Sequence, residues 1–134
     1  MKLGLTNPAV ARLERRERWR LDRANALALR EVFPAVQELR IELSFESTTT
    51  STPTSQSHVL HPPARAFFEF RCPYSDCDGQ FDLTRAVNSA LADPAHQAEG
   101  VLECGGARAR DRGSKQPCQL RLIYTVTAIR QRDT

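Results

Sequence analysis

The chain has 134 residues, a formal net charge of +3 at pH 7, 40% hydrophobic residues and 26% charged residues. This length and composition predict one globular domain over residues 1–134. A membrane-spanning protein is excluded, because no apolar run approaches the roughly 20 residues that a span needs. The N-terminal stretch lacks the continuous apolar segment of a secretory signal, so we expect a cytoplasmic protein.

Residues 9–33 predict one long helix, because no glycine or proline interrupts them, helix formers dominate and Pro34 follows. A helical turn of about 100° per residue places most of their apolar side chains on one face, which we expect to pack on a sheet. This face holds Val10, Leu13, Leu21, Ala24, Leu27 and Ala28. The opposite face holds Arg12, Arg15, Arg16, Trp19 and Arg23.

Four strands and a second, short helix are predicted downstream. Residues 39–46 alternate strictly, so Leu39, Ile41, Leu43 and Phe45 are expected to face inward, against the long helix. The other predicted strands cover 65–71, 101–104 and 118–129, and the short helix covers 82–92 with Asp82 as its N-cap. Residues 47–57 are rich in serine and threonine and carry no apolar anchor, so they predict a flexible loop.

The strongest chemical signal is a set of four cysteines in the second half of the chain, Cys72, Cys77, Cys104 and Cys118. Four thiolates close a tetrahedral structural zinc site and leave no open position for catalysis. Disulfides or unliganded core thiols are the alternatives, and a reducing cytosol disfavours the disulfides. Each of Cys72, Cys104 and Cys118 shares a strand face with apolar neighbours, so the thiols are expected to meet at one corner of the core. We therefore predict one structural zinc ion.

Residues 66–129 resemble the zinc-ribbon group of domains, in which cysteines from two turns of an antiparallel sheet bind one zinc ion. By this resemblance Cys72 and Cys77, with Pro73 and Gly79, form the first knuckle. The second pair is Cys104, followed by Gly105 and Gly106, and Cys118, preceded by Pro117. Four and thirteen residues separate the paired cysteines where ribbons usually have two, and a helix lies between the pairs. The resemblance therefore implies a zinc fold and no particular function.

The remaining sequence patterns give weaker indications of a metal-binding or catalytic site. His58 and His61 have the spacing of a metal-binding pair but lie in a polar segment beside two prolines, which favours ordinary surface residues. His96 and Glu99 do not fit the zinc deaminase signature, which needs H-x-E and a later P-C-x-x-C. No nucleophile elbow or phosphate-binding glycine loop is present in the sequence. We therefore predict a protein that is not an enzyme.

Two basic groups are candidates for binding a partner. The arginines of the long helix, with Trp19, could contact phosphates and a base, or form a solvated face paired with nearby carboxylates, or dock a protein. The second group lies between the last two cysteines and consists of Arg108, Arg110, Arg112 and Lys115. A basic loop held by a metal suits phosphate binding, although such loops are also common on soluble surfaces.

The sequence as a whole predicts an α+β fold: a long N-terminal helix packed on a four-stranded, mostly antiparallel sheet, with a short helix and a zinc site at one end. The predicted function is a zinc-stabilised binding module that associates with RNA or DNA through its basic surfaces. The alternative is a protein-interaction or assembly factor that docks through the helix bearing Trp19. Salt dependence separates the two, because counterion release makes nucleic-acid affinity fall steeply with ionic strength.

Overall fold

The structure, a computed structural model, describes the backbone of residues 8–47, 54–74, 77, 79–109 and 115–130, and their side chains except those of 8–12, 107–109 and 115–117. The fold is α+β, as predicted. The helices are α1 (Pro8–Asn25), α2 (Leu29–Val32) and α3 (Thr84–Ala92). The strands are β1 (Val36–Ser47), β2 (Thr54–Leu60), β3 (Glu69–Arg71), β4 (Gln80–Asp82), β5 (Gln97–Glu103), β6 (Ala107–Ala109), β7 (Lys115–Pro117) and β8 (Leu120–Arg130).

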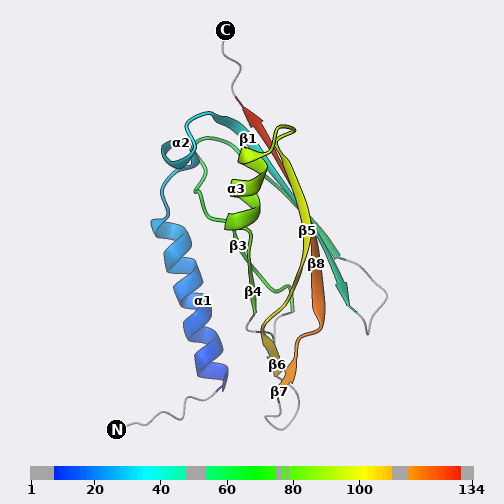
Figure 1. The fold of residues 1–134 in the computed structure, drawn as a ribbon. Coiled ribbons are helices and arrows are strands. Elements are labelled where there is room, and N and C mark those ends of the chain that lie inside the picture. Colours follow the sequence, from blue (N-terminus) through cyan, green and yellow to red (C-terminus); the bar gives the residue numbers. More distant parts are fainter. Residues whose placement is uncertain (1–7, 48–53, 75–76, 78, 110–114, 131–134) are drawn as a thin grey trace.

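The main sheet has four antiparallel strands in the order β2-β1-β8-β5 (Figure 1). Its inner face carries the alternating apolar residues of β1 that the sequence predicted, Leu39, Ile41, Leu43 and Phe45, each buried to 2% exposure or less. Leu122 and Val126 of β8 continue this layer. The buried face of β1 predicted from the alternation of apolar and polar residues is therefore confirmed.

The helix that covers the inner face is α3, which packs against β5 and β8 (Figure 1). Its buried side is formed by Ala86, Val87 and Ala90. Asp82 accepts hydrogen bonds at one carboxylate oxygen from the backbone N–H and the hydroxyl of Thr84, but the N-cap position belongs to Leu83, so the prediction of Asp82 as N-cap is wrong by one residue. The prediction that the long N-terminal helix lies on this sheet is wrong, because α3 already occupies the face.

The single helix predicted over 9–33 is interrupted after Asn25. The backbone groups that would continue the helix form hydrogen bonds with a distant segment instead. Leu29 N–H donates to the Ala64 carbonyl at 2.7 Å, and Ala66 N–H donates to the Leu27 carbonyl at 2.7 Å. Ala28 and Arg65 form an isolated antiparallel bridge. These bonds replace the i to i−4 ladder, so only the short α2 follows.

Helix α1 presents the face opposite to the one predicted. Leu13 and Leu21 are 62% and 51% exposed, and Leu27, which follows the helix, is 61% exposed. Trp19 is half-buried: its ring meets the edge of Phe67 at a centroid distance of 5.7 Å, and its Nε1–H donates to the Glu69 carbonyl at 3.0 Å. An indole offers a large apolar surface together with a hydrogen-bond donor, which a leucine does not. Trp19 therefore anchors α1 beside β3.

Two further predictions need correction at β2 and β3. Residues 54–60, assigned to the loop 47–57 and its flank, form a strand paired with β1 from Thr54 opposite Phe45 to Leu60 opposite Leu39. Residues 48–53 of the predicted loop lie outside the described residues. The predicted strand 65–71 is strand only at Glu69–Arg71, and it pairs with β4 instead of joining the main sheet. An edge of β1 remained to be paired, and β2 supplies that partner.

Candidate metal centre and flanking clefts

All four cysteines meet at one end of the main sheet. Cys72 follows β3, Cys77 lies between β3 and β4, Cys104 follows β5, and Cys118 precedes β8. Each thiol is buried, and none is in a disulfide. The convergence predicted from strand facing is confirmed, although the first pair comes from a separate two-stranded sheet rather than from the main one.

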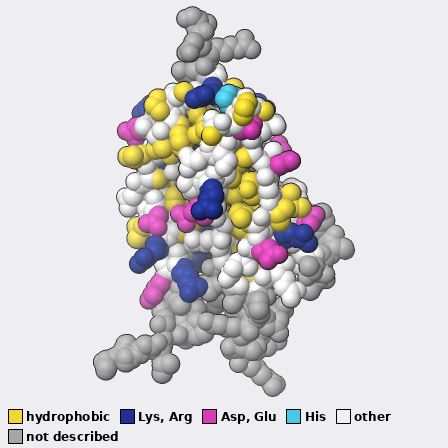
Figure 2. Space-filling model, in the orientation of Figure 1, with side chains coloured by type: hydrophobic (Ala, Val, Ile, Leu, Met, Phe, Trp, Pro, Cys, Tyr) yellow, Lys and Arg dark blue, Asp and Glu magenta, His cyan; other side chains and the backbone are white. Residues whose placement is uncertain are grey.

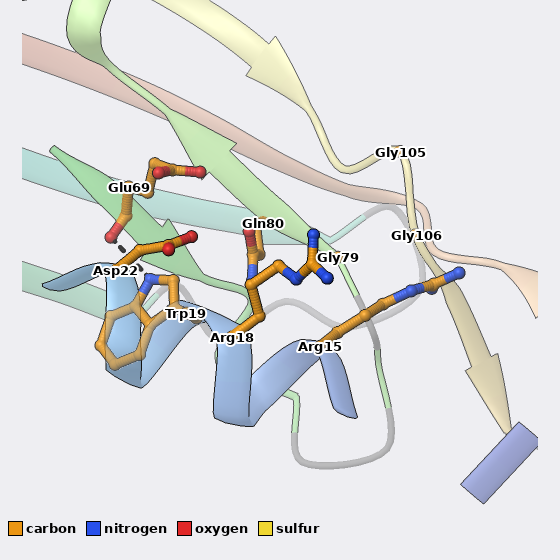
Figure 3. A pocket seen from close by; sticks show the side chains of 9 residues that line it. All are labelled: Arg15, Arg18, Trp19, Asp22, Glu69, Gly79, Gln80, Gly105 and Gly106. Carbon is orange, nitrogen blue, oxygen red and sulfur yellow. Dashed lines mark hydrogen bonds between the residues drawn. The ribbon is translucent and has the colours of Figure 1, made fainter. Parts of the chain in front are cut away.

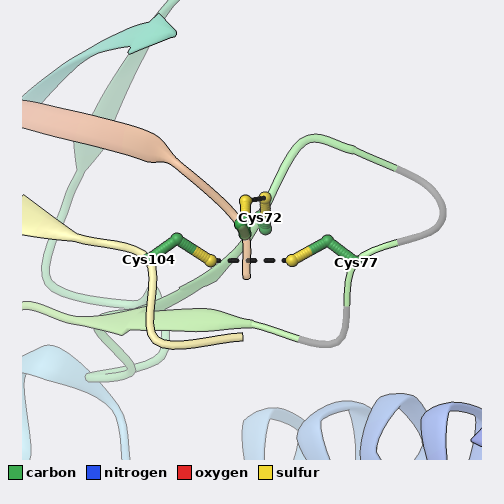
Figure 4. A group of neighbouring side chains, drawn as sticks. Cys72, Cys77 and Cys104 are labelled. Atoms are coloured by element: carbon green, nitrogen blue, oxygen red, sulfur yellow. Dashed lines mark hydrogen bonds between the residues drawn. The ribbon is translucent and has the colours of Figure 1, made fainter. Parts of the chain in front are cut away.

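The spacing of the sulfur atoms suits one tetrahedral metal ion (Figure 4). All four Sγ atoms lie within 4.8 Å of one another, with Cys72 and Cys118 at 3.8 Å and Cys77 and Cys104 at 3.6 Å. A metal–sulfur bond of about 2.3 Å gives a tetrahedron with an edge of about 3.8 Å. The cluster can therefore hold one ion, with every tetrahedral position taken by the protein.

Backbone hydrogen bonds hold the two cysteine pairs in place. Cys72 N–H donates to the Gly79 carbonyl at 3.0 Å, and the Gly79 N–H donates back to the Cys77 sulfur at 3.3 Å. On the other side Cys104 N–H donates to the Leu120 carbonyl and Cys118 N–H donates to the Gly106 carbonyl. The β5–β8 ladder thus continues past the last two cysteines into β6 and β7, and fixes their separation.

Gly79 allows the two pairs to approach each other. A Cβ at this position would lie 2.2 Å from the Cys104 sulfur and 3.1 Å from the Gly106 nitrogen. Its backbone needs no positive φ, so the requirement for glycine is space alone. Gly105 contrasts with it, since a Cβ there meets nothing within 4 Å.

The pKa values of the cysteine thiols shift in different directions. Hydrogen bonding from Cys72 lowers the pKa of Cys104 to about 5, with a further contribution from the Gly106 backbone. Burial raises the pKa of Cys77 to about 12. The same hydrogen bond with Cys104, followed by burial, raises the pKa of Cys72. Several thiolates crowded together are unfavourable without a cation, and a bound metal ion supplies the compensating charge.

The histidines lie elsewhere. Within the described residues, the cysteines are the group whose geometry fits a metal ion. His58 packs on Phe70 with ring centroids 4.9 Å apart, while His61 faces Glu38 with 3.2 Å between Nε2 and Oε1. His96 occupies a turn with a φ of 57°. Neither His58 nor His61 replaces a cysteine in the cluster.

The predicted basic residues are only partly covered by the described structure. Arg110 and Arg112 lie outside it, as do the side chains of Arg12, Arg108 and Lys115. Arg15 and Arg23 are exposed on α1, and Arg16 is half-buried. Charges of both signs are interspersed on the face seen in Figure 2, and Arg20 pairs with Glu17 at 2.7 Å. The outward side of α1 is thus a mixed, solvated surface.

Two clefts lie beside the contact of Trp19 with Glu69, between α1 and the segments that it faces. The first, which we call the knuckle cleft, has a volume of about 390 Å³ and lies between α1 and the cysteine turns (Figure 3). Arg15 and Arg18 extend from α1 toward the glycines of those turns. Its lining is Arg15, Arg18, Trp19, Asp22, Glu69, Gly79, Gln80, Gly105 and Gly106.

The second, the aromatic cleft, has a volume of about 480 Å³ and lies between α1, β2 and β3. It is lined by Trp19, Arg23, Gln56, His58, Leu60, Ala64, Arg65, Phe67, Glu69, Phe70 and Arg71. Trp19 and Glu69 line both clefts, which therefore adjoin. Sequence reasoning missed Arg18 because helical periodicity places it about 100° from Trp19, off the predicted arginine face. It missed Arg65 and Arg71 because they lie in other segments that show no cluster of basic residues.

Comparison of the chain with protein-family models, curated proteins and solved structures found no match. Among the helices within the described residues, none is both long and apolar enough to cross a bilayer.

Proposed function

We propose that the protein is a non-enzymatic module in which one zinc ion, bound by the four cysteines, stabilises a nucleic-acid-binding surface. Zinc is favoured because four soft thiolates in a tetrahedral arrangement suit it and complete its coordination. A site closed in this way supplies folding energy rather than chemistry. Elemental analysis of purified protein should find one zinc per chain, and iron in its place would contradict the choice of metal.

The observation that carries the binding function is the lining of the two adjoining clefts. Five arginines line them, three from α1 and two from the segment that leads into and forms β3, against the two carboxylates of Asp22 and Glu69. The arginines are Arg15, Arg18, Arg23, Arg65 and Arg71. Burial, followed by the charges of Asp82 and Asp22, raises the pKa of Glu69. The surplus of guanidinium groups in concave sites suits a phosphate backbone.

In the knuckle cleft, glycine main chain lies beside the arginines. Gly79, Gly105 and Gly106 line it on the side facing Arg15 and Arg18 (Figure 3). Glycine lets a ligand approach the main chain closely, as phosphate sites often require. The alternative function, docking of a protein on an exposed Trp19, is less well supported, since this indole is engaged with Phe67 and Glu69.

Fluorescence anisotropy with labelled RNA and DNA oligonucleotides tests the proposal. Affinity should fall steeply between about 50 and 200 mM salt as counterions rebind. Replacing Arg15 and Arg18 together by alanine should weaken binding and reduce the slope of log K against log salt by about 1.4 for a single strand. Arg30→Ala with Arg121→Ala is the matched control, because both arginines are exposed and neither lines a cleft. Absence of binding near 50 mM salt, or equal effects of the two double variants, would overturn the proposal.

A further inference from the structure

We infer that the aromatic cleft holds one unpaired base of a single-stranded nucleic acid, with an adjacent phosphate in the knuckle cleft. This inference rests on the proposed nucleic-acid function and specifies the class of strand.

The walls of the aromatic cleft are rings that the fold leaves half-exposed. His58 and Phe70 face each other with centroids 4.9 Å apart, and Trp19 meets Phe67 at 5.7 Å. All four lie at the cleft, and each keeps part of its surface open to solvent. Half-exposed aromatic side chains are the surfaces on which single-stranded nucleic acids stack their bases.

Arginines complete the same cleft. The guanidinium groups of Arg23 and Arg71 lie 5.5 and 5.8 Å from the centroid of Trp19. A guanidinium held near a ring by cation–π attraction still has N–H donors to offer to phosphate oxygens or to a base edge. Arg65 is held at the rim by its hydrogen bond to the Ala26 carbonyl at 2.8 Å. Aromatic and cationic groups in one cleft match a ligand that is both flat and anionic.

Polar groups at the β2 wall suit the edge of a base. His58 Nε2 and Gln56 Oε1 are 3.1 Å apart, which leaves the Gln56 amide nitrogen as a donor. Burial, followed by the charge of Arg23, lowers the pKa of His58 from 6.5. A neutral imidazole at pH 7 can stack without adding charge, so the arginines supply the electrostatic attraction.

The shape of the site favours an unpaired base. A cleft of about 480 Å³ between α1 and two strands can accept a single ring system. A duplex keeps its bases stacked inside, and delivering one to the cleft requires extrusion at a cost of a few kcal/mol. The knuckle cleft meets the aromatic cleft at Trp19 and Glu69, so a strand that stacks a base in one can place a phosphate in the other.

Three ligands of equal length test the inference: a single-stranded oligonucleotide, the same sequence as a duplex, and an abasic strand with the same number of phosphates. Trp19 is the only tryptophan and lines both clefts, so its intrinsic fluorescence reports occupancy directly. The single strand should bind most tightly and change this fluorescence. Loss of the bases should weaken binding by roughly five- to a hundredfold.

Phe70→Leu removes an aromatic wall while keeping an apolar side chain. It should weaken binding of the base-bearing strand by a similar factor and leave the abasic strand unaffected. Phe33→Leu is the matched control, because Phe33 is half-buried against Phe68 and lies outside the cleft. Zinc content and melting temperature confirm that both variants fold.

The outcomes separate the two proposals. Equal affinity for the base-bearing and abasic strands, or for single strand and duplex, would overturn the base-binding inference while phosphate binding stands. Equal effects of Phe70→Leu and Phe33→Leu would also overturn it. Failure of all three ligands to bind would reject the nucleic-acid function together with the inference.

Discussion

Replacing Gly79 by alanine should break the metal centre without changing a ligand. The new Cβ would lie 2.2 Å from the Cys104 sulfur, against the 3.4 Å at which ordinary contact begins. Relief of this clash requires a displacement of about 1.2 Å. The Gly106 backbone, 3.1 Å from the same Cβ, limits movement of the glycine turn. The sulfur of Cys104 must therefore move out of its position in the cluster.

Metal–ligand distances tolerate deviations of only about 0.2 Å, so a shift of this size should detach one thiolate. Binding of structural zinc contributes about 10–16 kcal/mol over four ligands, and one quarter of this is about 3 kcal/mol. A loss of 3 kcal/mol corresponds to a decrease of roughly hundredfold in zinc affinity. Since metal binding and folding are coupled, the melting temperature should fall as well.

The assay is competition for zinc against a chromophoric chelator, with thermal unfolding measured in parallel. Gly105→Ala is the matched control, because it makes the same chemical change beside the same cysteine and its Cβ meets nothing within 4 Å. Neither glycine has a positive φ, so neither alanine variant introduces backbone strain, and a difference in zinc affinity between them reflects the clash alone. Equal zinc affinities for the two variants would refute the reasoning from the geometry of the cluster.

Three further outcomes are expected. Cys77→Ser should lower the melting temperature sharply and remove bound zinc, and a stable protein with four titratable thiols and no zinc by elemental analysis would contradict the metal proposal. Leu43→Ala should cost about 2–5 kcal/mol in chemical denaturation, whereas Glu42→Ala, on the exposed face, should be near neutral; equal effects would mean that β1 has been misread. Trp19→Ala should release α1, because the hydrogen bond to Glu69 and the contact with Phe67 are lost, and amide exchange in α1 should become about tenfold faster or more. Leu21→Ala should leave amide exchange in α1 unchanged, because the Leu21 side chain is half-exposed.

Helix α1 shows where pattern reasoning goes wrong. Apolar periodicity placed Leu13 and Leu21 toward the core, yet both are exposed and Trp19 on the other face makes the contact. A periodic stripe indicates that a helix has two unlike faces. Which face is buried depends on the surface available, and here α3 covers the sheet while Phe67 and the Glu69 carbonyl offer a place for an indole.

Local rules were enough for several elements of this protein. Alternation in β1 identified Leu39, Ile41, Leu43 and Phe45 as core, because the period of a strand is set by its own backbone. The four cysteines were identified as one cluster because Cys72, Cys104 and Cys118 each share a strand face with apolar neighbours and Cys77 follows Cys72 closely in the sequence. The first inference needs only the residues of one strand, and the second needs only the number of cysteines and the facing of each strand that carries one.

Tertiary structure decided which segments meet. Strand β2 joined β1 although its sequence reads as a polar loop, and the helix predicted over 9–33 ended at Asn25 because residues 62–66 took its backbone hydrogen bonds. The two clefts likewise bring arginines from α1, β3 and the segment before it to one surface. The physical reason is shared: hydrogen bonds and charges between distant segments depend on the whole chain being folded, and no local pattern encodes them.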